Sequence, residues 1–158
     1  HENQRVCNWA VALSGEDDPP VLVESDSSPN VLWQPFADTF SEFINTAVSD
    51  WLGYTFMLCA QDIELTDRSL NHLRRYFVEG HVTHSWPGKD NYRFSLPDQY
   101  ILIWNSEGQA DWRLQANSIE RLEELCNKVW ECGNLSTTLY AHEREGENVL
   151  NNKRIGSN

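Results

Sequence analysis

Basic residues are nearly absent from the first 67 positions of this 158-residue chain, where Arg5 is the only Lys or Arg. The same stretch holds twelve of the 24 acidic residues, so its formal charge is 1 − 12 = −11 out of a net −12 for the whole chain. An acidic half of this kind repels duplex DNA, RNA and anionic membranes, and it attracts a basic protein or another cation. We therefore expect a protein partner that is basic, and we expect neither nucleic acid nor a membrane as a partner.

The sequence also lacks any apolar run long enough to cross a membrane. Its longest candidates, residues 54–60 and 100–104, fall far short of the roughly 18 residues that a spanning helix needs. The first residues contain no basic segment followed by an apolar core, so we expect no signal peptide. None of the four cysteines belongs to a C-x-x-C pair, and we expect reduced thiols in a cytoplasmic protein. A bridge between Cys126 and Cys132 in a secreted form is the alternative.

Motifs for phosphate binding and nucleophilic catalysis are missing as well. Neither G-x-x-x-x-G-K nor G-x-G-x-x-G occurs, and there is no G-x-S-x-G turn. The best metal candidates are His81, His84 and Asp90, but they share a predicted loop and no further Cys or His has a matching spacing. The acids of residues 17–26 match no calcium-binding EF-hand loop. We expect a protein that is not an enzyme and that has no catalytic residue, no cofactor and no metal site.

Aromatic residues, in contrast, are abundant: seven Trp, six Phe and five Tyr predict a folded domain rather than a disordered acidic segment. Alternating apolar residues predict strands, and apolar residues at helical spacing predict helices. The expected strands cover residues 6–13, 21–23, 31–33, 93–96, 100–104, 110–116 and 135–141. The expected helices begin at Asp38 or Thr39, at Thr66 or Asp67, and after Ser118, because these side chains suit a helix N-terminus.

This order of elements predicts one α+β domain over residues 1–142. Its sheet is expected to be mostly antiparallel, with about three helices packed on it. Residues 80–92 are expected to form a loop, since they are polar and contain Pro87-Gly88. Residues 143–158 are expected to form a frayed C-terminal tail.

Short motifs in the N-terminal third resemble one known family. Glu-Asn-Gln at residues 2–4 precedes a strand with Val6 and Trp9, Asp-Pro-Pro-Val occupies residues 18–21, and Phe-Ser-x-Phe begins at Phe40. The sequence resembles the SUKH superfamily, which includes a yeast regulator of cell-wall synthesis and many immunity proteins of bacterial polymorphic toxins. The resemblance covers residues 2–58 and, more loosely, residues 93–129. It implies an α+β domain without catalytic residues that binds another protein, often a toxin nuclease or deaminase.

The acidic half and the resemblance together predict a non-enzymatic protein-binding module of the immunity type. Acidic side chains would steer a basic partner such as a toxin toward the protein, and a buried aromatic anchor would hold the complex. The residues assigned to this surface are Glu16, Asp17, Asp18, Asp26, Asp38 and Glu42, with Trp33 as the anchor.

Two other functions stay open. The first is a small-molecule-binding protein or an enzyme with an aromatic-lined pocket between sheet and helices and a carboxylate such as Asp111. The second is a homo-oligomer, such as a homodimer, that buries its own apolar surface.

Four tryptophans fall on the inner faces of predicted elements and are expected in the core, namely Trp9, Trp51, Trp104 and Trp112.

Overall fold

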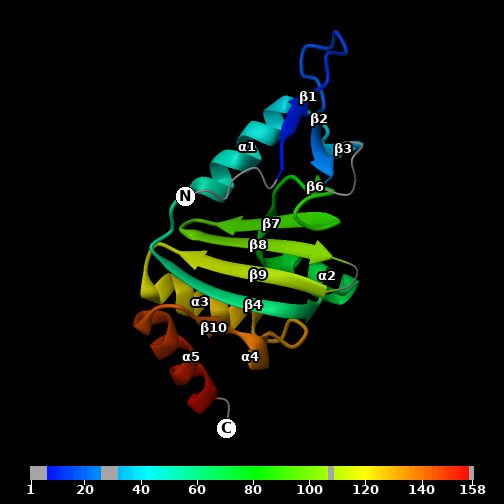
Figure 1. Ribbon diagram of the computed structural model, residues 1–158. Coiled ribbons are helices and arrows are strands. Elements are labelled where there is room, and N and C mark those ends of the chain that lie inside the picture. Colours follow the sequence, from blue (N-terminus) through cyan, green and yellow to red (C-terminus); the bar gives the residue numbers. More distant parts are fainter. Residues whose placement is uncertain (1–6, 26–31, 107–108, 157–158) are drawn as a thin grey trace.

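A large antiparallel sheet forms the centre of the protein (Figure 1). The structure, a computed structural model, describes residues 7–25, 32–106 and 109–156. Seven strands pair in the order β10-β4-β9-β8-β7-β5, with β6 also paired to β7. Their bounds are β4 Phe56–Glu64, β5 Val78–Glu79, β6 Thr83–His84, β7 Asp90–Leu96, β8 Gln99–Ser106, β9 Gln109–Ala116 and β10 Tyr140–Ala141. The expected α+β class with a mostly antiparallel sheet is confirmed.

One face of this sheet is covered by helices, and β9 shows why. Its even-numbered side chains, from Ala110 to Ala116, are buried, whereas Asp111, Arg113 and Gln115 point to the opposite face. The buried side chains join one core with apolar residues of α2 (Asp67–Tyr76), α3 (Ile119–Val129), α4 (Leu135–Thr138) and α5 (Arg144–Gly156). Figure 1 shows α2 and α3 behind the sheet and α5 below it.

A second, smaller layer lies at the end of the molecule opposite α5 (Figure 1). Strands β1 (Trp9–Val11), β2 (Val21–Ser25) and β3 (Leu32–Ala37) correspond to the first three predicted strands and form an antiparallel meander, and α1 (Phe40–Trp51) follows it. This layer has a small core of its own, made of Val21, Val23, Phe36 and Ala37. Trp86, from the loop between β6 and β7, packs against that core and links the two layers.

A hydroxyl side chain caps the N-terminus of each of the three predicted helices. Thr39, Thr66 and Ser118 each accept a hydrogen bond from the backbone N–H three residues later. Each bond satisfies an amide that the first turn of a helix leaves without a partner. The helix starts predicted from the sequence are therefore confirmed.

Two expected elements are wrong. The strand expected at residues 135–141 is a single helical turn followed by the short β10, because Leu135 and Leu139 lie four apart and both bury their side chains. The expected loop at residues 80–92 contains β6 and the start of β7. In addition, β4 was not predicted. It lies between β9 and β10, and its first residues are a continuous apolar run rather than an alternating one.

The C-terminal segment is not a frayed tail. Residues Arg144–Gly156 form α5, and the side chains of Val149 and Leu150 are buried in the main core. Gly146 permits this packing, since an added Cβ would lie 2.7 Å from the Cβ of Ala141 in β10. Most residues of the segment are polar, so its short apolar face is not evident from the sequence. That face is recognised only from the sheet and α3, against which it packs.

We expect Leu150→Ala to lower the free energy of unfolding by about 2–5 kcal/mol, because it leaves a cavity in the core. Ile155→Ala, on the same helix but three-quarters exposed, should change it by less than about 0.5 kcal/mol. Urea unfolding followed by circular dichroism measures both values. Equal effects of the two variants would show that α5 does not dock.

Candidate functional site

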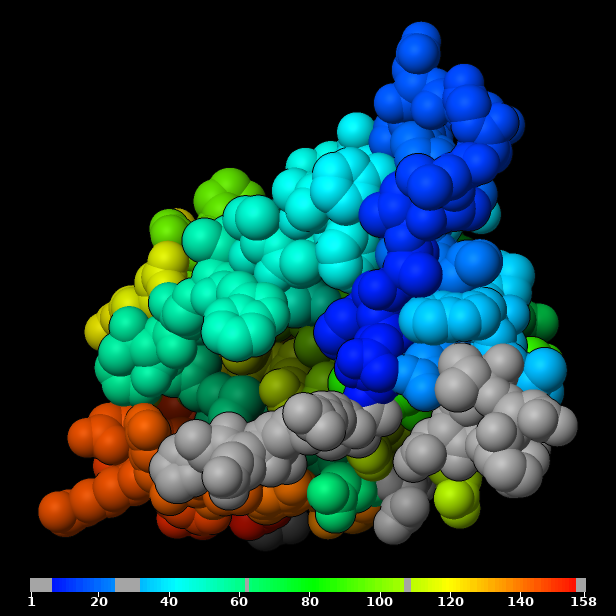
Figure 2. All heavy atoms as spheres, turned by 45° about the horizontal axis from the view of Figure 1, so that its top comes forward, coloured from blue at the N-terminus to red at the C-terminus, as the bar shows by residue number. Residues whose placement is uncertain are grey.

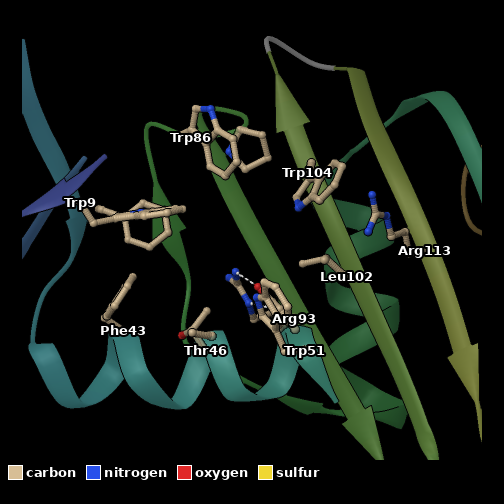
Figure 3. A pocket seen from close by; sticks show the side chains of 13 residues that line it. Trp9, Phe43, Thr46, Trp51, Trp86, Arg93, Leu102, Trp104 and Arg113 are labelled. Carbon is tan, nitrogen blue, oxygen red and sulfur yellow. Dashed lines mark hydrogen bonds and ion pairs between the residues drawn. The ribbon is translucent and has the colours of Figure 1, made fainter. Parts of the chain in front are cut away.

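A cavity of about 480 Å³ lies between the small layer and the face of the large sheet that is opposite α2, α3, α4 and α5 (Figure 3). Its floor comes from three neighbouring strands, where Arg93 of β7, Leu102 of β8 and Arg113 of β9 are paired across the sheet. Its walls come from α1 and from aromatic residues of β1 and the β6–β7 loop. The complete lining is Trp9, Phe36, Phe43, Thr46, Ala47, Asp50, Trp51, Trp86, Pro87, Arg93, Leu102, Trp104 and Arg113.

A charged network at the base of the cavity fastens α1 to the sheet. The carboxylate of Asp50 accepts hydrogen bonds from Nε of Arg93 at 3.0 Å and from its Nη2 at 2.7 Å. The hydroxyl of Tyr100 donates to the same carboxylate at 2.7 Å. Burial and the nearby Asp50 charge raise the pKa of Tyr100 above its usual range, so this hydroxyl keeps its proton.

Arg93 is almost fully buried, and its Nη1 group has acceptors as well. Its Nη1 donates to the hydroxyl of Thr83 and to the backbone oxygen of Asn91, both at 3.1 Å, and to that of His81 at 3.4 Å. A buried guanidinium needs this degree of satisfaction, because burying a charge without partners is costly. Arg93 therefore holds the architecture of the cavity and is not available to a ligand.

The opposite wall is an aromatic cluster centred on Trp9. Its ring centroid lies 5.9 Å from that of Phe36, 6.0 Å from Phe43 and 5.7 Å from Trp86, in edge-to-face or tilted arrangements. Gly88 lets the loop that carries Trp86 approach β8, since a Cβ there would overlap the carbonyl oxygen of Asn105. The cluster joins the small layer to the β6–β7 loop of the sheet.

Arg113 is the second cation of the cavity, and it differs from Arg93. Its guanidinium lies 4.1 Å from the ring centroid of Trp104, which is a cation–π contact. Among the side chains that the structure describes, no carboxylate lies within ion-pair distance of this group, and no described acceptor takes a hydrogen bond from it. Figure 3 shows Arg113 beside Trp104 at the sheet side of the cavity.

The outer surface of α1 is unusually apolar. We call the side chains Phe40, Ile44, Val48, Trp51 and Leu52 the α1 stripe; all five are exposed, Trp51 to 87%. The helix buries a different side, where Phe43, Thr46 and Asp50 face the small core and the sheet. Figure 2 shows α1 lying open across this face of the molecule beside β1. The core positions expected for Trp9, Trp51 and Trp104 are therefore wrong, since Trp104 is only partly buried and lines the cavity, whereas Trp112 is buried as expected.

The predicted acidic residues gather at the N-terminal end of α1. The carboxylate of Asp18 accepts a 2.9 Å hydrogen bond from the backbone N–H of Ser41, and this bond lowers the pKa of Asp18. It brings the acidic turn with Glu16 and Asp17 to the helix end where Asp38 is located. Glu42, one turn further along, lies 3.2 Å from the ring of His81. In the described part of the chain, no Lys or Arg forms an ion pair with these five acids.

The other predicted residues lie apart from this group or outside the description. Trp33 is on β3 opposite Glu24 of β2, with 44% of its surface exposed. Asp26 falls outside the described residues. Asp111 does not line the main cavity; it borders a shallower depression nearby with Cys59 and Tyr140.

Only two of the three candidate metal ligands meet in the structure. His84 contacts Asp90 at 2.7 Å, but His81 contacts Glu42 on α1 instead. Across the described ranges, no group of three His, Cys, Asp or Glu side chains could hold a metal ion. The same part of the chain contains no helix that is long and apolar enough to span a membrane.

Sequence reasoning missed the three residues that define the cavity, Asp50, Arg93 and Arg113. A signal existed for Asp50: it lies seven residues after Phe43 on the helix side that faces the sheet, where an acid requires a buried partner. The identity of that partner is not encoded locally, because Arg93 is 43 residues away.

Comparisons with protein-family models, with curated proteins and with solved structures return no significant match. The resemblance to the SUKH superfamily therefore stays a prediction.

Removing the carboxylate of Asp50 should destabilise the protein strongly. We expect Asp50→Ala to lower the free energy of unfolding by about 3 kcal/mol, because Arg93 would be left buried and unpaired. Tyr100→Phe should cost about 1.5 kcal/mol by removing one hydrogen bond to a charge. Tyr76→Phe, whose ring is half exposed, is the matched control with an expected change below about 0.5 kcal/mol. If urea unfolding gave the same stability for all three variants, the network would have no structural role.

The four thiols are free and should differ in reactivity. Burial raises the pKa of Cys126 and of Cys132 to about 11, so both are protonated near neutral pH, whereas Cys7 is partly exposed. With iodoacetamide near pH 8, we expect Cys7 to be alkylated first, and we expect Cys126 and Cys132 to react only as the protein unfolds. Peptide mass spectrometry of samples with and without denaturant measures this order. Rapid labelling of Cys126 in the folded protein would contradict it.

Proposed function

We propose that this chain is a non-enzymatic protein-binding module that docks a basic partner on the α1 stripe. The exposed stripe is the observation that carries the proposal. Monomeric proteins seldom leave contiguous large apolar side chains in water, and such patches usually mark interaction sites. The members of the stripe follow helical spacing, which is how a helix presents anchors to a complementary groove.

The charge around the stripe sets the chemistry of the partner. Asp17, Asp18 and Asp38 lie at its N-terminal end, and residues 40–51 contain two acids and no base. Asp50 is the one acid of the helix that is neutralised, by Arg93. The remaining acids supply an attractive field for a basic surface, which accelerates encounter, while the apolar side chains would slow dissociation.

A second copy of this chain is a poorer occupant. Two stripes facing each other would bring the same uncompensated acids together, and each chain has a formal net charge of −12. Like charges at an interface oppose association. Charge repulsion therefore favours a hetero-complex over the homodimer.

An immunity role in the cytoplasm is the specific form of the proposal. A toxin that acts on nucleic acid must attract phosphates and therefore presents a basic surface. Such a surface is complementary to the acids beside the α1 stripe, and it matches the partner class that the SUKH resemblance implies. The four free thiols fit a reducing compartment.

The stripe is tested by affinity capture from the source cells with Ile44→Glu and Val48→Glu variants. We expect one partner with a basic isoelectric point, whose purified form binds the wild type at least about thirtyfold more tightly than either variant, since buried anchors dominate interfaces. Val78→Glu and Ile155→Glu introduce the same charge at exposed apolar positions that do not belong to the stripe, and they should bind like the wild type. Equal loss in all four variants, or a partner that is acidic, would refute the proposal.

The acids are tested by association kinetics with the same purified partner. The double variant Asp17→Lys, Asp38→Lys should slow association by roughly tenfold at low salt, and the difference should shrink as salt screens the field. The double variant Glu131→Lys, Glu143→Lys changes the net charge equally on exposed sites of the C-terminal half. If both doubles slowed association to the same extent, only the net charge would matter and the local surface would have no role.

A further inference from the structure

The cavity beneath α1 has the properties of a second, separate site. Its volume of about 480 Å³ is within the range of small-molecule pockets, and most of its lining is aromatic or aliphatic. The docking surface proposed above does not require this cavity, since the stripe lies on the outer side of α1. Trp51 alone belongs to both features.

The charges in the lining favour an anion. Three charged groups border the cavity: Asp50, Arg93 and Arg113. Asp50 and Arg93 neutralise each other through two hydrogen bonds, and the guanidinium of Arg113 is left over. Aromatic-lined sites often bind cations. In this cavity a cationic ligand would be repelled by the unpaired guanidinium of Arg113, so we do not assign the aromatic rings to cation binding.

Arg113 is placed to receive a carboxylate. One face of its guanidinium rests on Trp104, which orients the planar group and leaves its N–H donors at the edge. Those donors bind no acceptor that the structure describes, although the side chain is partly buried. Asp111, two residues earlier on the same strand face, borders an adjacent depression together with Arg113 and Trp104, but it makes no ion pair with Arg113. The guanidinium is therefore an oriented donor fork at the rim of an apolar cavity.

The aromatic walls define the rest of the ligand. Trp9, Trp86 and Trp104 approach the cavity from β1, the β6–β7 loop and β8, and Figure 3 shows their rings around the central space. Rings of this kind pack well against a flat apolar body in stacked or edge-to-face contacts. Leu102 adds an aliphatic floor.

We propose that this cavity is a binding site for a small organic acid with a flat apolar body, whose carboxylate pairs with Arg113. The body lies among the tryptophan rings and the carboxylate accepts hydrogen bonds from the guanidinium edge. Arg93 and Asp50 act as positioning residues, because they hold α1 at the distance from the sheet that keeps the cavity open.

The test uses 1-naphthoate as the probe, with 1-naphthalenemethanol and 1-naphthylmethylamine as probes of the same shape that are neutral and cationic. Isothermal titration calorimetry should show that the carboxylate binds best and the amine worst. Arg113→Gln should weaken naphthoate binding by about tenfold to a hundredfold, the range expected on losing a charged hydrogen-bonded pair, and leave the alcohol unaffected. Arg75→Gln, an exposed arginine on α2 with the same charge change, should bind naphthoate like the wild type.

A second variant distinguishes the loss of the cavity from the loss of the fold. Ala47→Phe adds a ring to the α1 wall of the cavity and should reduce binding of all three probes, with circular dichroism and unfolding stability unchanged. Absence of naphthoate binding at millimolar concentration, or equal affinity in the wild type and Arg113→Gln, would overturn the inference. Ile44→Glu should retain naphthoate binding, so failure of this site and failure of the partner surface are read separately.

Discussion

The contact of Asp50 with Arg93 and Tyr100 is the constraint on which the rest of the structure depends. It is where α1 is tied to the large sheet through buried charge, and hydrogen bonds of this kind are directional. By fixing α1 at one position, it determines which side of the helix faces inward. Together with the packing of Phe43 against Trp9 and Phe36, this attachment leaves the α1 stripe exposed and the cavity open.

The two proposed sites use opposite sides of the same helix. Outside, apolar side chains lie next to uncompensated acids, a combination suited to a basic protein surface. Inside, aromatic rings surround one available cation, a combination suited to an apolar acid. Trp51 lies at the junction of the two, at the C-terminal end of α1. The N-terminal layer therefore concentrates the recognition features, while the helix-covered sheet supplies the rigid support.

Elements with a clear local signal were predictable. Alternation on β9 and hydroxyl caps at Thr39, Thr66 and Ser118 are properties of a few neighbouring residues, and they agree with the structure. Elements defined by distant partners were not. β4 is recognisable only from its place between β9 and β10, and α5 only from the surface that buries Leu150. The acidic turn could be located from the sequence, but its contact with Ser41 could not.

The sequence by itself determined the charge asymmetry, the α+β class and the amphipathic character of α1, because each follows from composition or from spacing within one element. Only the tertiary structure decided which part of the wide apolar arc of α1 is buried, and that Arg93 is paired whereas Arg113 is not. Those outcomes depend on residues 43 or more positions apart being brought within hydrogen-bonding distance, as for Asp50 and Arg93. Local patterns state what a side chain prefers, but the fold decides which partner it meets.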